Sequence, residues 1–281
     1  MSAADEAVDP IADWDDAYAN AAHIEGGADY PERWAERAAG FRTSLSSAGR
    51  SRLDLSYGSA PRNLLDLFLP AGDSLGLVVF VHGGYWKAFD KSSWSHLAEG
   101  ALAGGYAVAI PSYTHCPEAR IGDITKEIAA AIEYAAMQME GPIALCGHSA
   151  GGHLVTRMIC RDSPVSEGTA RRIKRTVSIS GLHDLRPLMA TAMNDALRID
   201  WEEAQAESPA LLAPKPHQSV VAWVGAKERP EFIRQSGILA IMWRSFDARM
   251  KLVEEPGRHH FDVIDGLADP NHALTSALVG A

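Results

Sequence analysis

Residues 143–151 read Ile-Ala-Leu-Cys-Gly-His-Ser-Ala-Gly, and their pattern is the strongest indication of the fold. The apolar run 143–146 is typical of a strand buried on both faces, and residues 150–160 have the apolar spacing of a helix. Between them, Gly147-His148-Ser149-Ala150-Gly151 fits the pattern G-x-S-x-G. A strand, a tight turn and a helix in this order form a nucleophile elbow, which lifts a serine hydroxyl above the sheet. Ser149 is therefore the candidate nucleophile, and the alternative is a glycine-rich turn with an ordinary serine.

Strands and helices also alternate on both sides of this stretch. The apolar patterns predict further strands at residues 53–57, 64–69, 77–81, 106–110, 176–179, 220–224 and 250–253. They predict further helices at residues 92–103, 121–139, 231–243 and 270–279, and in part of residues 7–42. This order predicts an α/β fold with a mostly parallel central sheet and helices on both faces. Functional side chains are then expected at the carboxyl ends of the strands.

The charge of the chain is concentrated at its beginning. The 281 residues carry a formal net charge of −10, from 36 acidic and 26 basic residues. Residues 1–32 hold nine carboxylates and neither Lys nor Arg, so the rest of the chain is close to neutral. We expect an acidic, partly helical extension at 1–50, either a solvated segment or a lid or interface piece. A single α/β domain is expected at 51–281, with a partial cap within 182–217.

Several classes of protein are disfavoured by the composition. A net negative charge argues against a nucleic-acid partner, and no apolar stretch is long enough to span a bilayer. The beginning of the chain lacks the basic and apolar regions of a signal peptide, and the three cysteines are an odd number without zinc-site spacing. We therefore expect a cytoplasmic protein with reduced thiols, no metal and no cofactor. A small-molecule substrate is the expected partner, and the sequence leaves room for a homo-oligomer.

A second glycine-rich loop follows the predicted strand 77–81. It reads His82-Gly83-Gly84-Tyr85-Trp86, close to the H-G-G-G loop of lipases and esterases. Small residues allow backbone N–H groups to approach a developing oxyanion. We expect these donors from Gly83, Gly84 and Tyr85, and from Ala150 after the candidate nucleophile. For the Tyr85 and Trp86 side chains, core packing and pocket lining are both open.

A serine nucleophile needs a base and an acid, in the chain order Ser, acid, His. The base is expected after the last strand, where His259 and His260 are adjacent, and at most one of them can serve. The acid is expected after strand 220–224, where Glu228 lies nearer the strand end than Glu231 and is favoured. His82 and His148 flank turns, and we expect them to brace loops.

These motifs together resemble the α/β-hydrolase family, and within it the arylformamidase (kynurenine formamidase) group. The resemblance extends from about residue 57 to 267 and includes Ser180-Gly181-Leu182-His183-Asp184-Leu185, Pro230-Glu231-Phe232 and His260-Phe261-Asp262. It implies Ser149 as nucleophile, His260 as base and Glu228 as acid. The group usually has Asp at the acid position, and Gly151-Gly152-His153 replaces its commoner Gly-Ala-His.

The resemblance implies a serine hydrolase that cleaves an N-formyl arylamide, N-formyl-L-kynurenine in particular, through an acyl-serine. A general carboxylesterase or thioesterase with the same residues is the alternative, since the fold does not determine the leaving group. A non-catalytic receptor on a hydrolase scaffold is a third reading. We expect Tyr85 and Trp86 to form a flat wall for an aromatic group, and His183 and Asn194 to reach a charged head group.

Overall fold

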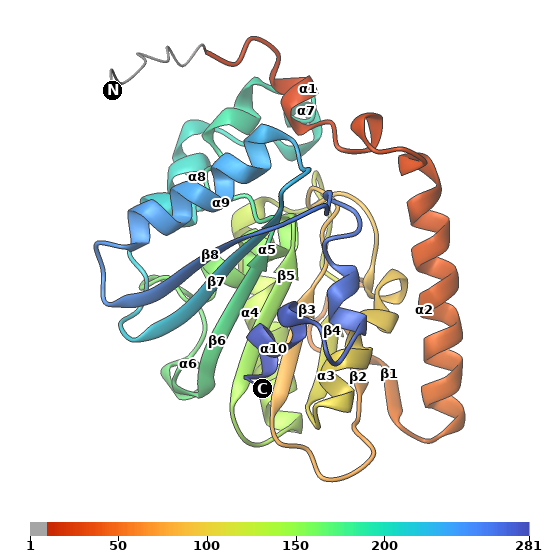
Figure 1. Ribbon diagram of the computed structural model, residues 1–281. Helices are drawn as coiled ribbons and strands as arrows, with labels where there is room; N and C mark the ends of the chain where they lie inside the picture. The colour runs from red at the N-terminus through yellow and green to blue at the C-terminus, as the bar shows by residue number, and fades with distance from the viewer. Residues whose placement is uncertain (1–9, 281) are drawn as a thin grey trace, which may run out of the picture.

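The computed structural model describes residues 10–280, and an eight-stranded sheet forms its centre (Figure 1). The spatial order of the strands is β1-β2-β4-β3-β5-β6-β7-β8. The first two pairings, β1 with β2 and β2 with β4, are antiparallel, and all pairings from β4 through β3 to β8 are parallel. The strands are β1 (Ser51–Ser56), β2 (Leu64–Phe68), β3 (Leu77–Val81), β4 (Ala107–Pro111), β5 (Ile143–His148), β6 (Ile173–Ile179), β7 (Gln218–Gly225) and β8 (Ala248–Glu255).

Burial follows the position of each strand in the sheet. Every residue of β3, β4 and β5 is buried, as expected for strands covered on both faces, whereas the edge strands β1 and β8 have no buried residue. Neighbouring residues of a strand contribute to opposite cores: Val79 and Leu145 to one, and Val78 and Cys146 to the other. The mostly parallel α/β-hydrolase sheet predicted from the sequence is therefore confirmed.

Helices cover both faces of this sheet (Figure 1). The predicted helices 121–139, 150–160 and 231–243 correspond to α4 (Ile121–Gln138), α5 (Ala150–Arg157) and α9 (Pro230–Trp243). The predicted helix 92–103 is mostly wrong, because its first half forms the 3₁₀ turns η3 (Lys91–Ser93) and η4 (Ser95–Ala98) before α3 (Glu99–Ala103). Asp90 accepts a hydrogen bond from the Ser92 backbone N–H, and such local side-chain contacts compete with an α-helix. The other elements are α6 (Glu167–Arg172), η7 (Asp265–Ala268) and α10 (Ala273–Val279).

The beginning of the chain packs on the body of the protein. It forms α1 (Trp14–Tyr18), the turns η1 (Ala21–His23) and η2 (Gly27–Asp29), and α2 (Tyr30–Ser47). Trp34 of α2 is buried, and its ring centroid lies 4.7 Å from that of Trp94 in the loop after η3. The part of the acidic segment that holds Asp5, Glu6 and Asp9 lies outside the described residues. The division of the chain at residue 50 stays a prediction.

The segment 182–217 connects β6 to β7. It forms η5 (Arg186–Ala190), α7 (Asn194–Leu197), α8 (Trp201–Ala206) and η6 (Pro209–Leu211). Its contacts include α8 with α4 and η6 with α9, so it packs beside helices on one side of the sheet.

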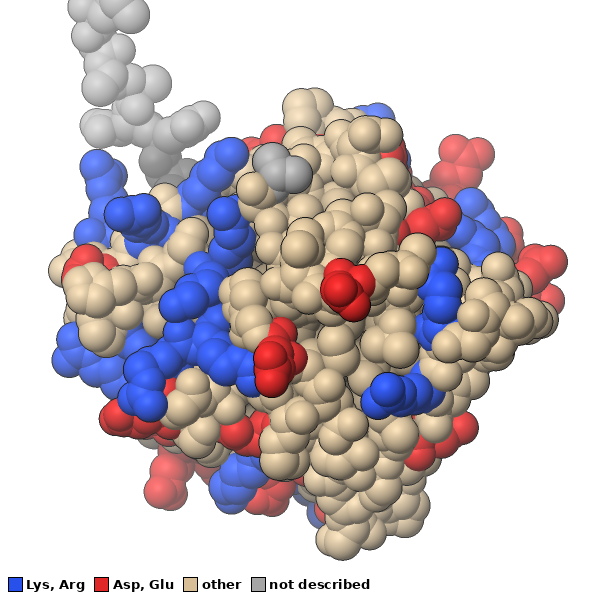
Figure 2. Space-filling view, turned by 90° about the horizontal axis from the view of Figure 1, so that it is seen from below, with Lys and Arg blue, Asp and Glu red and all other residues tan. Residues whose placement is uncertain are grey.

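Basic side chains gather in one part of the surface. Figure 2 views the end of the molecule opposite α1, where Lys and Arg side chains gather on one side. A groove beside α6 is lined by four basic residues, Arg161, Arg171, Lys174 and Lys215. In residues 10–280, no helix combines the length and the apolar character that crossing a bilayer requires.

Candidate active site

Ser149 lies at a sharp turn between β5 and α5. Its φ of +56° and ψ of −118° are unusual for a residue with a side chain, as expected of a nucleophile elbow. The glycines on either side are sterically required. A Cβ on Gly151 would lie 1.9 Å from the carbonyl oxygen of Val81, and one on Gly147 would lie 2.2 Å from that of Gly151. The two glycines allow β5 and α5 to approach closely enough to expose the Ser149 hydroxyl.

His260 and Glu228 come from the loops after β8 and β7, and they form a buried pair. His260 Nδ1 lies 2.6 Å from Glu228 Oε2. The other oxygen of Glu228 accepts hydrogen bonds from Ser180 Oγ at 2.5 Å and from the Gly225 N–H at 2.8 Å. Because the carboxylate accepts, Nδ1 carries the proton and Nε2 keeps its lone pair. This tautomer is the one that a general base requires.

His148 supports the His260 loop. Its Nε2–H donates to the backbone carbonyl of His260 over 2.9 Å. Burial, together with the neighbouring His260, holds the pKa of His148 well below its usual range, so this imidazole is neutral. His82 has a similar role, because its Nδ1 donates to the Gly83 carbonyl at 2.7 Å. Both histidines brace loops, as the sequence predicts.

Ser149 and His260 line a cavity of about 510 Å³. Among the described residues, its walls contain no Lys, Arg, Asp or Glu. Four aromatic rings, those of Trp34, Phe89, Trp94 and Phe261, form much of its apolar surface. The remaining lining residues are Tyr18, Ala19, Asn20, Ala21, Ala22, Gly27, Ala28, Pro31, Gly83, Gly84, Tyr85 and His148. The cavity therefore suits an uncharged, flat group bound next to Ser149.

The loop after β3 lies against the elbow. A Cβ on Gly83 would lie 2.9 Å from the carbonyl oxygen of His148 and 3.0 Å from Ser149 Cβ, so a side chain there would force the loop or the elbow to shift. Tyr85 and Trp86 have φ angles of +48° and +54°, which cost about 1–2 kcal/mol each for residues with side chains. Ala150 is the first residue of α5, where a backbone N–H has no partner within the helix. The structure thus brings Gly83, Gly84 and Tyr85 to the cavity beside Ser149 and Ala150.

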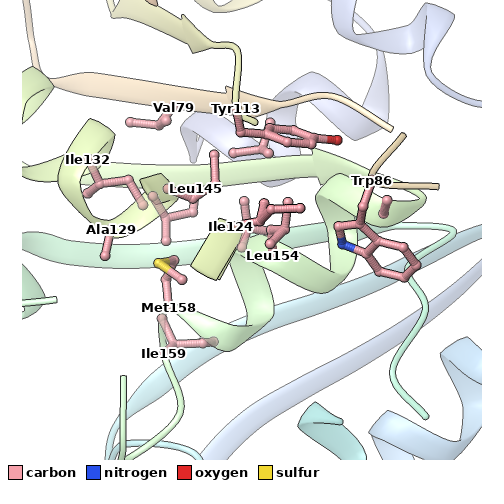
Figure 3. Close-up of a cluster of buried hydrophobic side chains, with 14 of the residues drawn as sticks. Val79, Trp86, Tyr113, Ile124, Ala129, Ile132, Leu145, Leu154, Met158 and Ile159 are labelled. Carbon is pink, nitrogen blue, oxygen red and sulfur yellow. The ribbon is translucent and has the colours of Figure 1, made fainter. Parts of the chain in front are cut away.

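The predicted pocket roles of Trp86, His183 and Asn194 are wrong, because none of them lines the cavity. Trp86 is fully buried in the core cluster of Figure 3, beneath the loop that carries it. His183 is also fully buried, and its Nε2 lies 3.2 Å from Ser178 Oγ. The Asn194 side chain closes a turn by bonding both backbone groups of Ile199.

Sequence reasoning missed most of the cavity wall. Phe261 is adjacent to the candidate base and could have been found from that position. Trp34 lies more than 100 residues before Ser149, and Phe89 and Trp94 follow the glycine-rich loop. None of these three residues belongs to a motif that could have revealed its place in the wall. The predicted cap within 182–217 contributes no residue to the cavity, whereas the segment 18–34 contributes nine.

No cysteine in the described part of the chain is a candidate nucleophile. Cys116, Cys146 and Cys160 are all buried and unpaired, and burial raises the pKa of each thiol well above its usual range. Within residues 10–280, no group of three His, Cys, Asp or Glu side chains could hold a metal ion.

Comparisons with known proteins show which family the chain belongs to. The chain is similar to the kynurenine formamidase of Salmo salar, with 29% identity over 87% of this chain and 84% of that protein. It is 52% identical to a Silicibacter sp. TM1040 protein of known structure that is provisionally named a thioesterase, with a TM-score of 0.90 over 95% and 98% of the two chains. An esterase from Pyrobaculum calidifontis shares the fold, with 18% identity and a TM-score of 0.68 over 89% and 91% of the chains. The BD-FAE family profile matches residues 65–233, so the chain belongs to the BD-FAE family of α/β-hydrolases and is a hydrolase.

Proposed function

We propose that this hydrolase cleaves N-formyl arylamides through an acyl-serine on Ser149, with N-formyl-L-kynurenine as the first substrate to test. The observation that carries the proposal is the buried pair of Glu228 and His260, with 2.6 Å between carboxylate and imidazole, beside a serine on a strained elbow. Similarity to kynurenine formamidases over most of the chain supports the choice of substrate. Formate and an aromatic amine are the expected products.

The reaction begins with attack of Ser149 Oγ on the formyl carbon, while His260 Nε2 takes the hydroxyl proton. Glu228 stays ionised and stabilises the imidazolium that forms. Backbone N–H groups of Gly84, Tyr85 and Ala150 stabilise the oxyanion, each contributing about 3–4 kcal/mol in comparable enzymes. The C–N bond then breaks as His260 donates its proton to the leaving nitrogen.

Hydrolysis of the formyl-serine completes the cycle. Water attacks the formyl carbon, and His260 again accepts a proton, this time from the water molecule. The C–O bond to Ser149 breaks, formate leaves, and the proton returns from His260 to Ser149 Oγ. In this proposal the aromatic ring of the leaving group packs among Trp34, Phe89, Trp94 and Phe261.

Hydrolysis of an uncharged ester or thioester is the second candidate, and a specific observation favours it. The cavity walls described above carry no charged side chain that could pair with the ionised amino-acid head of kynurenine. The similarity to the provisionally named thioesterase points in the same direction. The same serine, base and acid would serve either reaction.

Three substrates separate the candidates in one assay: N-formyl-L-kynurenine, formanilide and p-nitrophenyl acetate. Formanilide has the formyl arylamide group without a charged head, so it isolates the reaction type from head-group recognition. We expect kcat/KM on a formamide to equal or exceed that on the ester. If the ester exceeds both formamides by orders of magnitude, ester hydrolysis replaces the first candidate.

A further inference from the structure

The segment 13–34 crosses from one side of the active site to the other, and we call it the strap. Nine of its residues contribute half of the cavity lining: Tyr18 to Ala22, Gly27, Ala28, Pro31 and Trp34. In Figure 1 the strap passes over the top of the molecule from α1 to α2. The cavity is therefore a space between the strap and the hydrolase body.

The strap is bonded to the loop that carries the oxyanion donors. Tyr85 Oη donates to the backbone carbonyl of Tyr18 over 2.7 Å, and Asn20 Nδ2 approaches the same hydroxyl at 3.4 Å. Tyr85 has a positive φ, and a strained backbone persists only where its surroundings fix it. Trp86 is fixed by burial in the core, whereas the Tyr85 side chain is fixed by the strap.

Tyr18 is in turn anchored to α9. Its hydroxyl donates to Glu231 Oε1 at 2.7 Å and accepts from Gln235 Nε2 at 3.2 Å. Burial and the charge of Glu231 raise the pKa of Tyr18 far above its usual range, so the phenol keeps its proton. The Tyr18 ring packs edge-on against Phe232, whose other contacts include the His260 imidazole, with 4.3 Å between ring centroids.

A second contact fixes the strap beside the acid. Asp16 pairs with Arg229, the residue directly after Glu228, and with His23 Nε2 at 2.7 Å. Asp15 accepts a hydrogen bond from the Ala192 N–H at 2.8 Å. The strap thus joins the oxyanion loop to the loop of Glu228 and the start of α9.

We propose that Tyr18 is a positioning residue for the hydrolase reaction. Its hydroxyl is anchored to α9, and its backbone carbonyl accepts the hydrogen bond from the Tyr85 hydroxyl, so it holds the Tyr85 backbone in place against Ser149. The inference rests on the proposed function, since it assigns Tyr85 a backbone N–H that stabilises the oxyanion. A donor of this kind matters most when negative charge develops, so loosening the loop lowers kcat more than it raises KM. The hydrogen bonds between α9 and the Tyr18 side chain and between the Tyr18 carbonyl and Tyr85 therefore form one continuous connection.

The test is a double-mutant cycle with Tyr18→Phe, Tyr85→Phe and the double variant. Each substitution removes one hydroxyl and keeps the ring. Tyr106→Phe is the matched control, because Tyr106 Oη donates to the Val279 carbonyl at 3.2 Å near the C-terminus and takes no part in the cavity. The readouts are kcat and KM on p-nitrophenyl acetate and formanilide, with circular dichroism to check folding.

Tyr85→Phe and Tyr18→Phe are expected to lower kcat about five- to tenfold, the effect of one lost hydrogen bond. KM should change less than twofold, and Tyr106→Phe should change neither constant. The loss of kcat in the double variant should be no larger than in the more impaired single variant, because both hydroxyls act through the same chain of hydrogen bonds. If Tyr85→Phe does not fold, Tyr18→Phe alone must show the loss of kcat.

Wild-type kcat in folded Tyr18→Phe, or fully multiplicative losses in the double variant, would overturn the inference. A rise in KM alone would also overturn it, because the strap would then only shape the cavity. The Ser149→Ala variant shows whether such a result refutes the role of Tyr18 or the proposed function itself. Turnover retained by Ser149→Ala would refute the function, whereas its loss beside unaffected tyrosine variants would refute only the role of Tyr18.

Discussion

Replacing Glu228 by Gln should disable His260 as the proposed base while leaving the fold intact. Oε1 of Glu228 accepts from the Gly225 N–H and from Ser180 Oγ, so the Gln carbonyl oxygen must occupy that position. The Gln NH₂ group then faces His260 Nδ1 at the former 2.6 Å contact. An NH₂ group can only donate there, which forces the imidazole proton onto Nε2.

An imidazole protonated at Nε2 cannot accept the Ser149 proton. The corresponding acid-to-amide change in a serine protease lowers kcat about 10⁴-fold, or roughly 5.5 kcal/mol of transition-state stabilisation. We expect a loss of this order for Glu228→Gln, measured as kcat on p-nitrophenyl acetate, with a melting temperature near that of the wild type. Loss of charge alone, with the correct tautomer kept, would give a much smaller effect.

Glu231→Gln is the control for this experiment. Glu231 is as deeply buried and lies three residues away, but its oxygens bond Tyr18, Arg234 and Gln235 rather than His260. It should lose far less activity than Glu228→Gln. Glu228→Gln with kcat within tenfold of the wild type, or a larger loss of kcat in Glu231→Gln, would show that Glu228 does not orient His260.

Three further predictions concern stability. Gly151→Ala should abolish folding or activity, because its Cβ would overlap the Val81 carbonyl, and folded, active protein would contradict the elbow geometry. Gly237→Ala, in α9 with open space around it, should raise the free energy of unfolding by about 0.5–1 kcal/mol in urea titrations. Burial lowers the pKa of His82 to about 4 and of His153 and His183 to about 3. The unfolded chain binds these protons near pH 6.5, so stability present above that pH should fall as pH drops toward 4. Each of these three histidines contributes roughly 1.4 kcal/mol per pH unit to the fall below about pH 5.5. A free energy of unfolding that stays constant between pH 6.5 and 4.5 would contradict this prediction.

The sequence predicts what depends on local steric rules. Gly147 and Gly151 frame a turn that only glycines allow, so the elbow and the strand and helix beside it could be recognised from nine residues. Glu228 and His260 could be selected because parallel strands bring their carboxyl ends to one edge of the sheet. The structure places the two residues in contact, as that rule predicts.

The cavity wall could not be predicted in the same way. Trp86 and Tyr85 are neighbours with similar positive φ angles, yet one enters the core and the other reaches the strap. Their directions depend on long-range packing that no short motif encodes. The strap lies more than 100 residues from Ser149 in sequence, and its acidic composition indicates a solvated segment rather than the apolar inner face that it presents.

Fluorophosphonate labelling followed by peptide mapping tests whether Ser149 is the activated nucleophile. The probe reacts with a serine only where a base activates it, and the bond that it forms survives digestion. We expect one adduct, on Ser149 of the folded wild-type protein, with loss of turnover in proportion to labelling and no adduct in Ser149→Ala. An adduct on a different residue, or turnover that persists in Ser149→Ala, would contradict this expectation.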